Sequence, residues 1–446
     1  MDNPAKIQRI EQFQNMRVPL NMQAALVESN RCLLCYDAPC SAACPAGTDP
    51  AKFIRQIKFH NYKGAARTIR NNNILGGTCA HICPVEQLCE KECSIKALED
   101  PINIAGLQQF AVDYGITNSL ESTTPSKKTK GKIAIIGGGP AGLACASSLL
   151  NKDFSATIFE REDKAGGVPI YNIPEFRLPE QVITNDINNL LNQGVEFMFN
   201  SPIEDKESIS KLLSQGFDSV FISTGLSVPI TLDLLQGYDN AYDYNSFLRQ
   251  HKFGQKRGIL QGKIIAVIGG GSVAIDSAVT AKACGAKKVY LITLEQLHEL
   301  PAEKEEIELA HMMGIIIKSG SQIIKVKESG NHISSLSGVE VEPIESRQTN
   351  PSNTVIIDGT QFSINVDLVI QAIGTKPGSE ISEFDNNLQT DENGIIQVAD
   401  NYQTNIPFIF AAGDVVNGGK TVVQAIGEGK KAATSIINFL SKRTTI

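Results

Sequence analysis

The sequence predicts a multidomain protein in which an α-helical N-terminal region precedes two Rossmann-like α/β domains. Three observations predict this arrangement. A glycine-rich turn between a β-branched apolar run and a helix-period run occurs twice, about 130 residues apart. Apolar positions in the first 120 residues follow a helical period. Eight of the ten cysteines lie in that helical region, between Cys32 and Cys93.

Length and composition exclude several classes of protein. A chain of 446 residues has room for about three domains of roughly 150 residues. Hydrophobic residues make up 42% and charged residues 20%, which is ordinary globular usage. The net charge of −7 does not favour binding to nucleic acid or to anionic lipid, which are both negatively charged. Without a signal-like start or an apolar run of about 18 residues, we expect a soluble cytoplasmic protein with no membrane or nucleic-acid partner.

The elements follow in a simple order. Helix-period runs in FIRQIKFHNYKGAARTI and PINIAGLQQFAVDYG predict the helical domain, and the polar, basic ESTTPSKKTKGK predicts a linker. Strand-like runs between about Ile315 and Val369 are expected to complete the second α/β unit. The predicted parts are a helical domain at 1–120, the linker at 121–132, a first α/β domain at 133–250 and 376–446, and a second at 251–375.

The first glycine turn has the dinucleotide-binding pattern. Gly137-x-Gly139-x-x-Gly142 follows a strand and opens a helix, so the glycines permit the tight turn and the helix N-terminus faces a pyrophosphate. Glu160 ends the next strand, 21 residues after Gly139, where a carboxylate can bind a ribose 2′-hydroxyl. Alone, the glycine pattern could be a plain turn. In this context it predicts a dinucleotide site.

The second glycine turn is Gly269-x-Gly271-x-x-Ala274, and the pattern tolerates alanine at the third position. An NADP site usually places an arginine near the end of the following strand. The stretch LITLEQLHEL has no Arg or Lys there, and Glu295 would repel a 2′-phosphate. NAD is therefore favoured over NADP, although Glu295 could also be a solvated loop charge.

Two such units followed by AAGDVV near the C-terminus resemble the layout of two-dinucleotide flavoprotein reductases. That resemblance implies FAD in the first unit and the tail, with Asp414 near the ribityl–phosphate portion, and a nicotinamide nucleotide in the second unit. A redox-active CxxC pair is absent after Gly137, where Cys145 and Cys284 stand alone in helices and are expected to be core residues. Electrons must therefore leave the flavin by another route.

The clustered cysteines indicate iron–sulfur chemistry. The first group reads Cys32-x2-Cys35-x4-Cys40-x3-Cys44-Pro, and the second contains Cys79, Cys83, Cys89 and Cys93. Structural zinc sites prefer two knuckles of two ligands each, whereas a bacterial ferredoxin run also ends in C-x3-C-P and lends its fourth cysteine to another cluster. By the same logic the first three cysteines begin one cluster, and Cys44 joins a second. Zinc and structural thiols remain as alternatives.

These residues together resemble a known family. The chain is similar to the small, electron-input subunit of bacterial NAD-dependent dihydropyrimidine dehydrogenase (PreT-type), and more distantly to the small subunit of glutamate synthase. The resemblance extends from about Arg31 to the C-terminus. The segments that favour the pyrimidine branch are RCLLCYDAPCSAACPAGTDPAKFIRQI, NYKGAARTIRNNNILGGTCAHICP and EDPINIAGLQQF.

The resemblance implies two sets of ligands for two [4Fe-4S] clusters. One set is Cys32, Cys35, Cys40 and Cys93, and the other is Cys44, Cys83, Cys89 and Gln108. Without the family, Gln108 is an ordinary helix residue, and Cys79 is its rival as the eighth ligand.

The expected nucleotide contacts complete the candidate sites. The family has an arginine near the flavin in an E-x-R-L-P stretch, and the matching stretch here, EFRLP, contains Arg177. The residues expected at FAD are Gly137, Gly139, Pro140, Gly142, Glu160, Gly167, Arg177, Gly413, Asp414 and Thr421. Those expected at NAD are Gly269, Gly271, Ser272, Val273, Glu295 and Gly374. No catalytic side chain is expected beyond the cofactors.

The family implies an oxidoreductase that oxidises NADH with FAD and passes electrons through two clusters to a separate FMN-containing (PreA-type) subunit. That partner would reduce uracil or thymine, in a heterotetramer, because no residues after the linker remain for a barrel that binds FMN and pyrimidine. One alternative is a glutamate synthase-type NAD(P)H oxidoreductase feeding a different partner. Another is a zinc-stabilised scaffold with vestigial nucleotide folds.

Overall fold

The computed structural model describes residues 16–120, 130–203, 206–254, 258–344 and 353–443. Most of the predicted linker, residues 121–129, lies outside the described residues. The described chain folds into two compact units. We call residues 171–174 and 228–375 the central unit, and the remaining described residues the main unit.

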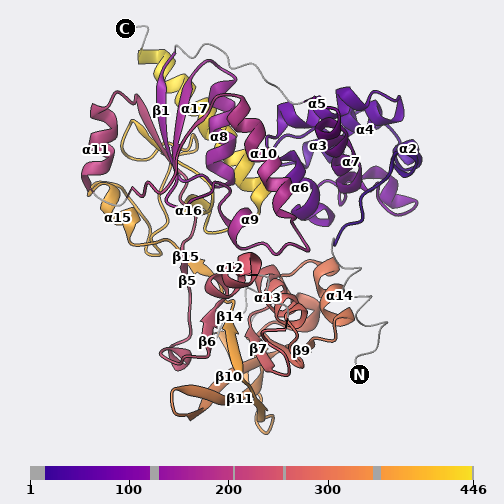
Figure 1. Cartoon of the computed structure of the whole chain (residues 1–446), viewed down its shortest axis with the longest axis vertical. Helices are drawn as coiled ribbons and strands as arrows, with labels where there is room; N and C mark the ends of the chain where they lie inside the picture. The colour runs from indigo at the N-terminus through magenta and orange to yellow at the C-terminus, as the bar shows by residue number, and fades with distance from the viewer. Residues whose placement is uncertain (1–15, 121–129, 204–205, 255–257, 345–352, 444–446) are drawn as a thin grey trace. The chain divides into compact units, whose positions relative to one another are not determined.

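The N-terminal part of the main unit is helical, as predicted (Figure 1). Its elements are α2 (Met22–Arg31), α3 (Pro39–Ala42), α4 (Pro50–Lys58), α5 (Tyr62–Asn72), α6 (Gly76–Ile82), the 3₁₀ turns η1 (Val85–Gln87) and η2 (Ser94–Ala97), and α7 (Ile104–Thr117).

Side-chain caps explain where the longer of these helices begin. The side-chain oxygens of Asp49, Asn61 and Asn103 accept hydrogen bonds from the backbone N–H groups of the first turns of α4, α5 and α7. Phe53 from α4 and Leu107 from α7 are fully buried in the core that these helices share. Four of the clustered cysteines pack against this core, so the helices position them.

A parallel five-stranded sheet forms the first α/β fold, in the order β16-β4-β1-β2-β3. Its strands are β1 (Lys132–Ile136), β2 (Ser155–Phe159), β3 (Glu196–Met198), β4 (Ser219–Ile222) and β16 (Ile409–Ala411). Its helices are α8 (Pro140–Leu150), α9 (Val168–Tyr171), α10 (Glu180–Asn192), α11 (Lys206–Ser214), α15 (Glu380–Phe384), α16 (Asp414–Asn417) and α17 (Val422–Arg443).

Helices cover both faces of this sheet, which accounts for its nearly continuous apolar strands. On one face, Leu212 of α11 and Phe384 of α15 pack with Ile136 in one buried cluster. On the other, α8 packs against β1 and β2, and α17 packs along α8 (Figure 1). Phe410 of β16 contacts Phe439 of α17 with ring centroids 5.8 Å apart. The C-terminal helix is therefore an integral part of the first fold.

The central unit contains the second parallel sheet, in the order β6-β14-β7-β8-β9. Its strands are β6 (Ala241–Asp243), β7 (Ile264–Ile268), β8 (Lys288–Ile292), β9 (Ile316–Lys318) and β14 (Leu368–Gln371). The helical elements are η3 (Asp233–Leu235), α12 (Tyr244–Gly254), α13 (Ser272–Ala283), η4 (Leu297–Glu299) and α14 (Lys304–Met312). Two short strands, β5 (Val228–Pro229) and β15 (Thr375–Lys376), pair with each other.

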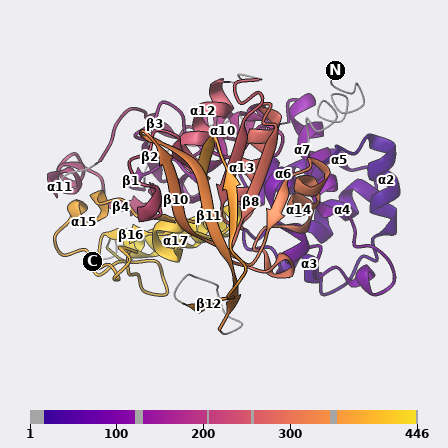
Figure 2. The same cartoon turned by 90° about the horizontal axis from the view of Figure 1, so that it is seen from below.

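Two features of the central unit were not part of the predicted layout. The strand-like runs lie in this unit, as expected, but β10 (Ser321–Ser329), β11 (His332–Pro343), β12 (Thr354–Ile356) and β13 (Phe362–Asn365) form an antiparallel sheet of their own (Figure 2). The main stretch of the unit starts at Val228 and not at the predicted boundary, residue 251, because β6 pairs with β14 at the edge of the second parallel sheet.

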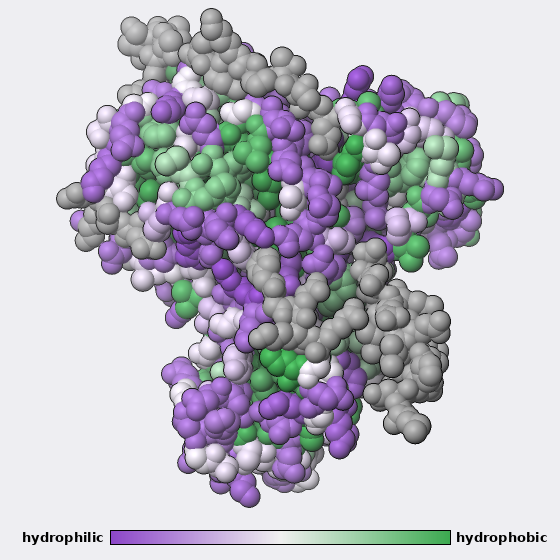
Figure 3. Space-filling model, in the orientation of Figure 1, coloured by the Kyte–Doolittle hydropathy of each residue, from purple (hydrophilic) through white to green (hydrophobic). Residues whose placement is uncertain are grey.

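The predicted fold class is confirmed: a helical N-terminal region precedes two Rossmann-like α/β folds. On the face shown in Figure 3, hydrophilic and hydrophobic residues are interspersed. Within the described part of the chain, no helix combines the length and the hydropathy needed to cross a membrane.

Candidate functional site

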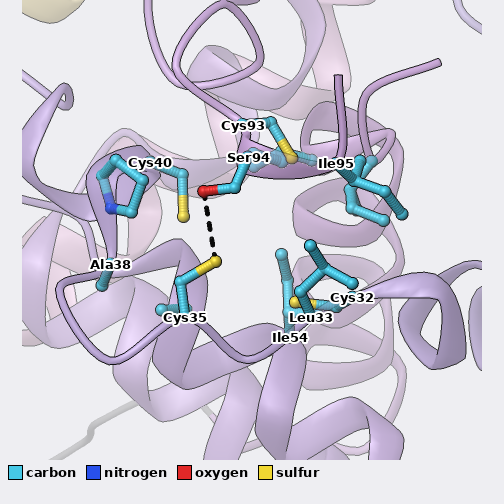
Figure 4. Close-up of a pocket in the computed structure, with 13 residues that line it drawn as sticks. Cys32, Leu33, Cys35, Ala38, Cys40, Ile54, Cys93, Ser94 and Ile95 are labelled. Atoms are coloured by element: carbon cyan, nitrogen blue, oxygen red, sulfur yellow. Dashed lines mark hydrogen bonds between the residues drawn. The ribbon is translucent and has the colours of Figure 1, made fainter. Parts of the chain in front are cut away.

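Four cysteines from two stretches of the chain line a single pocket in the helical region. Cys32 follows α2, Cys35 lies in the next loop, Cys40 is in α3, and Cys93 precedes η2. Figure 4 shows all four around the same space, with the Cys35 thiol donating to Ser94 Oγ at 3.3 Å. These are the four residues that the family resemblance assigns to one cluster, and the fold brings them together.

The loop that carries the first three cysteines has an unusual backbone. Leu34 and Ala38 adopt φ angles of 54° and 44°, in the left-handed region that non-glycine residues rarely occupy. The chain therefore bends sharply twice between Cys32 and Cys40. Such strain persists where the surrounding structure imposes it, and it commonly marks functional sites.

The pocket is mainly apolar, with Ile54, Ile95 and Ile104 among its lining residues. Burial raises the pKa of Cys40 to about 11 and also raises the pKa of Cys32. Such thiols stay protonated until a cation that binds thiolates displaces the protons. The donor set of four thiols in an apolar wall fits a [4Fe-4S] cluster. Among the described residues, no group of three or more His, Cys, Asp or Glu is placed to hold a single metal ion.

The second group of cysteines forms another neighbourhood in the same region. The charges of Cys44, Cys79 and Cys89 all act on Cys83, and burial holds the pKa of Cys83 well above its ordinary value. Cys89 is within electrostatic reach of both Cys44 and Cys40. Cys44, which follows α3, does not line the first pocket and lies near cysteines more than thirty residues further along the chain.

Gln108 and Cys79, the two candidates for the eighth ligand, are both buried beside α6. The Gln108 amide nitrogen donates to Gly76 O at 2.7 Å, and among the described residues no hydrogen bond engages its side-chain oxygen. The Cys79 sulfur accepts a hydrogen bond of 3.2 Å from the Asn73 amide, and burial raises the pKa of its thiol to about 12. A free oxygen on Gln108 and an engaged sulfur on Cys79 favour Gln108 as the ligand.

Helix α6, which ends at Cys83, is held at both ends. Asp186 of α10 is fully buried and accepts from Thr78 N–H and Thr78 Oγ, each at 2.8 Å, at the start of α6. Asp186 also forms an ion pair with Arg70 of α5. At the other end, the Arg17 guanidinium donates to Cys83 O at 3.0 Å. The first α/β fold and the N-terminal segment therefore both position the cysteines of this helix.

The first glycine turn forms an open cradle at the start of α8. Gly139 is the residue before α8, no side chain caps the helix, and a Cβ added at Gly139 would have nothing within 4 Å. Gly137 has a φ of 99°, and a Cβ on Gly142 would lie 2.1 Å from Gly137 O. Two glycines thus permit the turn, and the third leaves free space before the first N–H groups of α8, those of Ala141 and Gly142, because Pro140 has none. This geometry fits a pyrophosphate.

Glu160 lies where a ribose-binding carboxylate is expected, at the end of β2. It is buried, and its two oxygens accept hydrogen bonds from Gly138 N–H at 2.8 Å and from Glu162 N–H at 3.0 Å. Burial raises the pKa of Glu160, while these two hydrogen bonds act in the opposite direction. Each carboxylate oxygen has a further lone pair to offer a hydroxyl.

The C-terminal tail completes this site. A Cβ on Gly413 would lie 3.0 Å from Ala141 Cβ, so the tail loop runs beside the start of α8, and Gly167 approaches Gly139 in the same way. Burial raises the pKa of Asp414 to about 6, and Lys420 N–H donates to its carboxylate at 3.2 Å. Thr421 precedes α17, where its hydroxyl donates to the Gln424 side chain at 2.8 Å.

Glu428 in the tail was not predicted from the sequence, and Arg177 was predicted at the flavin only through the family resemblance. Glu428 Oε2 accepts from Gly413 N–H and from the Asn417 amide, both at 2.9 Å, so it holds the loop that carries Asp414. The sequence feature that could have indicated Glu428 is its position between two glycines, in the GEGK stretch of α17. Arg177, expected at the flavin, is partly buried two residues before Pro179, which precedes α10.

The second glycine turn repeats the cradle in the central unit. Gly271 precedes α13 without a side-chain cap and has open space on its Cβ side, whereas a Cβ on Gly269 would lie 2.2 Å from Ala372 O. Ser272 and Val273 begin α13, so their N–H groups have no partner within the helix. Gly374 has a φ of 118° just beyond β14. The turn fits a second dinucleotide.

Glu295 lies beside this turn. A Cβ on Gly270 would be 2.9 Å from Glu295 Oε2, and the Thr293 hydroxyl donates to the same oxygen. Glu295 thus takes the position at the second turn that Glu160 takes at the first. In dinucleotide folds a carboxylate at this position binds ribose hydroxyls and disfavours a 2′-phosphate, so the position of Glu295 is the one on which the prediction of NAD depends.

Comparisons with known proteins agree with this division. Residues 131–429 match the family described as pyridine nucleotide-disulphide oxidoreductase, and residues 9–120 match the family described as dihydropyrimidine dehydrogenase domain II, 4Fe-4S cluster. The solved thioredoxin reductase of T. acidophilum has a TM-score of 0.53 and 20% identity, covering 70% of this chain and 98% of that protein. This last likeness concerns the fold alone.

Two curated relatives span nearly the whole chain. The NAD-dependent dihydropyrimidine dehydrogenase subunit PreT of Escherichia coli O157:H7 is 38% identical over 416 residues, which cover 93% of this chain and 94% of that protein. The small chain of the NADPH glutamate synthase of Escherichia coli K12 is 30% identical over 453 residues, covering 98% and 96%.

Proposed function

Because the chain belongs to the family of PreT subunits of NAD-dependent dihydropyrimidine dehydrogenase, we propose that it oxidises NADH and delivers the electrons to an FMN-containing partner subunit that reduces uracil or thymine. The resemblance predicted from the cysteine-rich segments is confirmed by this membership. The chain is an NAD-dependent FAD and iron–sulfur oxidoreductase. The two clusters, the PreA-type partner, the heterotetramer and the cytoplasmic location belong to the proposal.

The observation that carries the proposal is the gathering of Cys32, Cys35, Cys40 and Cys93 around one pocket in a chain with two dinucleotide folds. Four half-buried thiols that line one mainly apolar pocket support a cluster that accepts single electrons. None of the ten cysteines is in a disulfide, which supports a reducing compartment and an electron exit other than a disulfide.

When bound, the flavin would supply hydride acceptance from NADH, and the clusters would supply single-electron transfer. The residues of the chain would bind and orient these cofactors. The start of α8 would hold the FAD pyrophosphate, and Glu160 would accept a ribose hydroxyl. The start of α13 and Glu295 would do the same for NADH. The apolar residues around Cys32, Cys35, Cys40 and Cys93 would exclude water from the cluster that these cysteines bind.

The purified chain alone is expected to reduce an artificial dye with NADH and to leave uracil unchanged. The reason is that the described folds provide two dinucleotide cradles and no second substrate domain. The measurement follows dye bleaching and uracil consumption in parallel, before and after the FMN-containing subunit is added. Turnover of uracil by this chain alone would contradict the proposal.

Glu295→Gln is expected to narrow the preference for NADH over NADPH by about tenfold, which corresponds to ~1.4 kcal/mol. The substitution removes the negative charge that faces a 2′-phosphate while keeping an acceptor for the ribose. The measurement is the ratio of kcat/KM for the two nucleotides in dye reduction. Glu299→Gln, in the exposed η4 turn, is the matched control and should leave the ratio unchanged. An unaltered ratio in Glu295→Gln would show that this carboxylate is only a loop charge.

A glutamate synthase-type role is the second candidate, favoured by 30% identity over 98% of the chain. That relative is named for NADPH, whereas Glu295 in this chain faces the second cradle. Co-purification from cells separates the two candidates, since the partner is an FMN-containing pyrimidine reductase in one case and a glutamate-forming subunit in the other.

A further inference from the structure

One turn of α17, Gly427–Lys430, contacts three parts of the main unit. Gly427 faces the cysteine region, because a Cβ added there would lie 2.2 Å from Pro45 O. Gly429 faces α8, because a Cβ there would lie 2.2 Å from Ala141 O. Glu428 between them holds the tail loop through Gly413 N–H. The turn therefore touches the FAD cradle on one side and the residue after Cys44 on the other.

Lys430 completes this turn and points to the cysteine region. Its ammonium donates to Ala46 O at 2.5 Å and to Asn72 O at 2.6 Å. Ala46 lies two residues after Cys44, and Asn72 ends α5 shortly before the α6 helix. One side chain of the first α/β fold therefore ties together the two backbone segments that carry Cys44 and lead to Cys83.

The charge of Lys430 has no carboxylate partner, because none of the ion pairs that the described residues form involves it. A half-buried ammonium is costly unless it is compensated. Burial lowers the pKa of Lys430, and the charge of Cys44 acts in the opposite direction. The ammonium lies against the backbone two residues after Cys44, where thiolate ligands of a cluster would supply negative charge.

We propose that Lys430 is a positioning residue for electron transfer: it holds the Cys44 loop on α17 and places a positive charge beside the cluster that Cys44 would bind. This inference rests on the proposed function, because it assumes a cluster at Cys44, Cys83 and Cys89. A nearby positive charge stabilises the reduced, more negative form of a cluster and so raises its reduction potential.

The test compares three variants of the full-length protein. Lys430→Met removes both the charge and the donors but keeps an unbranched stem, and Lys430→Gln keeps an amide donor without the charge. Lys431→Met is the matched control, since Lys431 is the exposed neighbour on the same helix. The potentials of the clusters are measured by electron paramagnetic resonance during titration with dithionite, and amide hydrogen exchange is followed at residues 44–47 and 72–76.

Lys430→Met should lower the potential of one cluster only and speed exchange in both segments. Lys430→Gln should lower the same potential with a smaller change in exchange, and Lys431→Met should change neither. Loss of iron from one site alone in Lys430→Met would also support the assignment. Unchanged potentials and exchange in both Lys430 variants would overturn it, as would equal shifts of both clusters.

These readouts use neither NADH nor uracil, so they separate this inference from the proposed function. If the unaltered protein gave no cluster signal at all, the proposed function would fail. The exchange measurement would still decide whether Lys430 holds the Cys44 loop.

Discussion

Cys93→Ser is expected to remove about half of the iron from the protein, because the proposed function has two clusters of four irons and gives Cys93 to one of them. Cys93 is far from Cys32, Cys35 and Cys40 in the sequence but lines the same pocket, so it closes that ligand set. A serine hydroxyl in its place is not a thiolate and holds iron poorly. Electron delivery to the partner should fall to background, while FAD remains bound.

Two other cysteines provide the controls for this experiment. Cys145→Ser alters a thiol that is fully buried in α8, away from the cysteine groups, and should leave the iron content unchanged. Cys79→Ser should also keep the iron if Gln108 is the eighth ligand. Full iron in Cys93→Ser, or zinc in the unaltered protein, would contradict the assignment of the first pocket.

Gly139→Ala is expected to fold normally and to lose FAD, with affinity reduced by at least about tenfold. A Cβ at this position meets nothing within 4 Å, so the fold can accept it. The same Cβ would occupy the space in which the pyrophosphate approaches the start of α8. The measurement is FAD content after gel filtration, followed by titration of the apoprotein with FAD and comparison of its melting temperature.

Gly142→Ala separates a packing effect from a binding effect. Its Cβ would lie 2.1 Å from Gly137 O, so this variant should lose about 1–3 kcal/mol of the free energy of unfolding. The two glycines thus predict opposite signatures: weak binding with unchanged stability at Gly139, and reduced stability at Gly142. Gly139→Ala with a full complement of FAD would show that the cradle does not hold the pyrophosphate.

Local signals in the sequence were sufficient for the two cradles. Gly137 and Gly269 adopt positive φ angles of 99° and 135°, conformations for which glycine is suited, so their spacing reports the turn directly. Glu160 and Glu295 follow one strand later in each unit, and the parallel pairing of consecutive strands places them beside the turns. Such features depend on short stretches of chain, which is why they could be read from the residues.

Features that depend on distant contacts could not be read in this way. Cysteine spacing divided the first group three and one, but only the family resemblance added Cys93 to Cys32, and the fold then placed them in one pocket. Lys430 contacts residues 384 and 358 positions earlier, and no local pattern marks it as a tether. Asp186 likewise reaches Thr78 from 108 positions away.

The antiparallel sheet shows the same limit. Apolar, β-branched runs such as those in β11 and β14 indicate strands but do not say which sheet they join. β14 pairs with β7 in the parallel sheet, whereas β11 pairs with β10 and β13 outside it. The choice is set by long-range packing rather than by the residues of each run.

In the proposed function, electrons from NADH leave this chain through iron–sulfur clusters. The most direct test adds NADH anaerobically to the purified full-length protein and records its low-temperature electron paramagnetic resonance spectrum together with the visible spectrum. We expect bleaching of the flavin and the appearance of reduced [4Fe-4S] signals without any partner subunit. Bleaching of the flavin in a protein whose iron–sulfur signals never appear, even with dithionite, would contradict it.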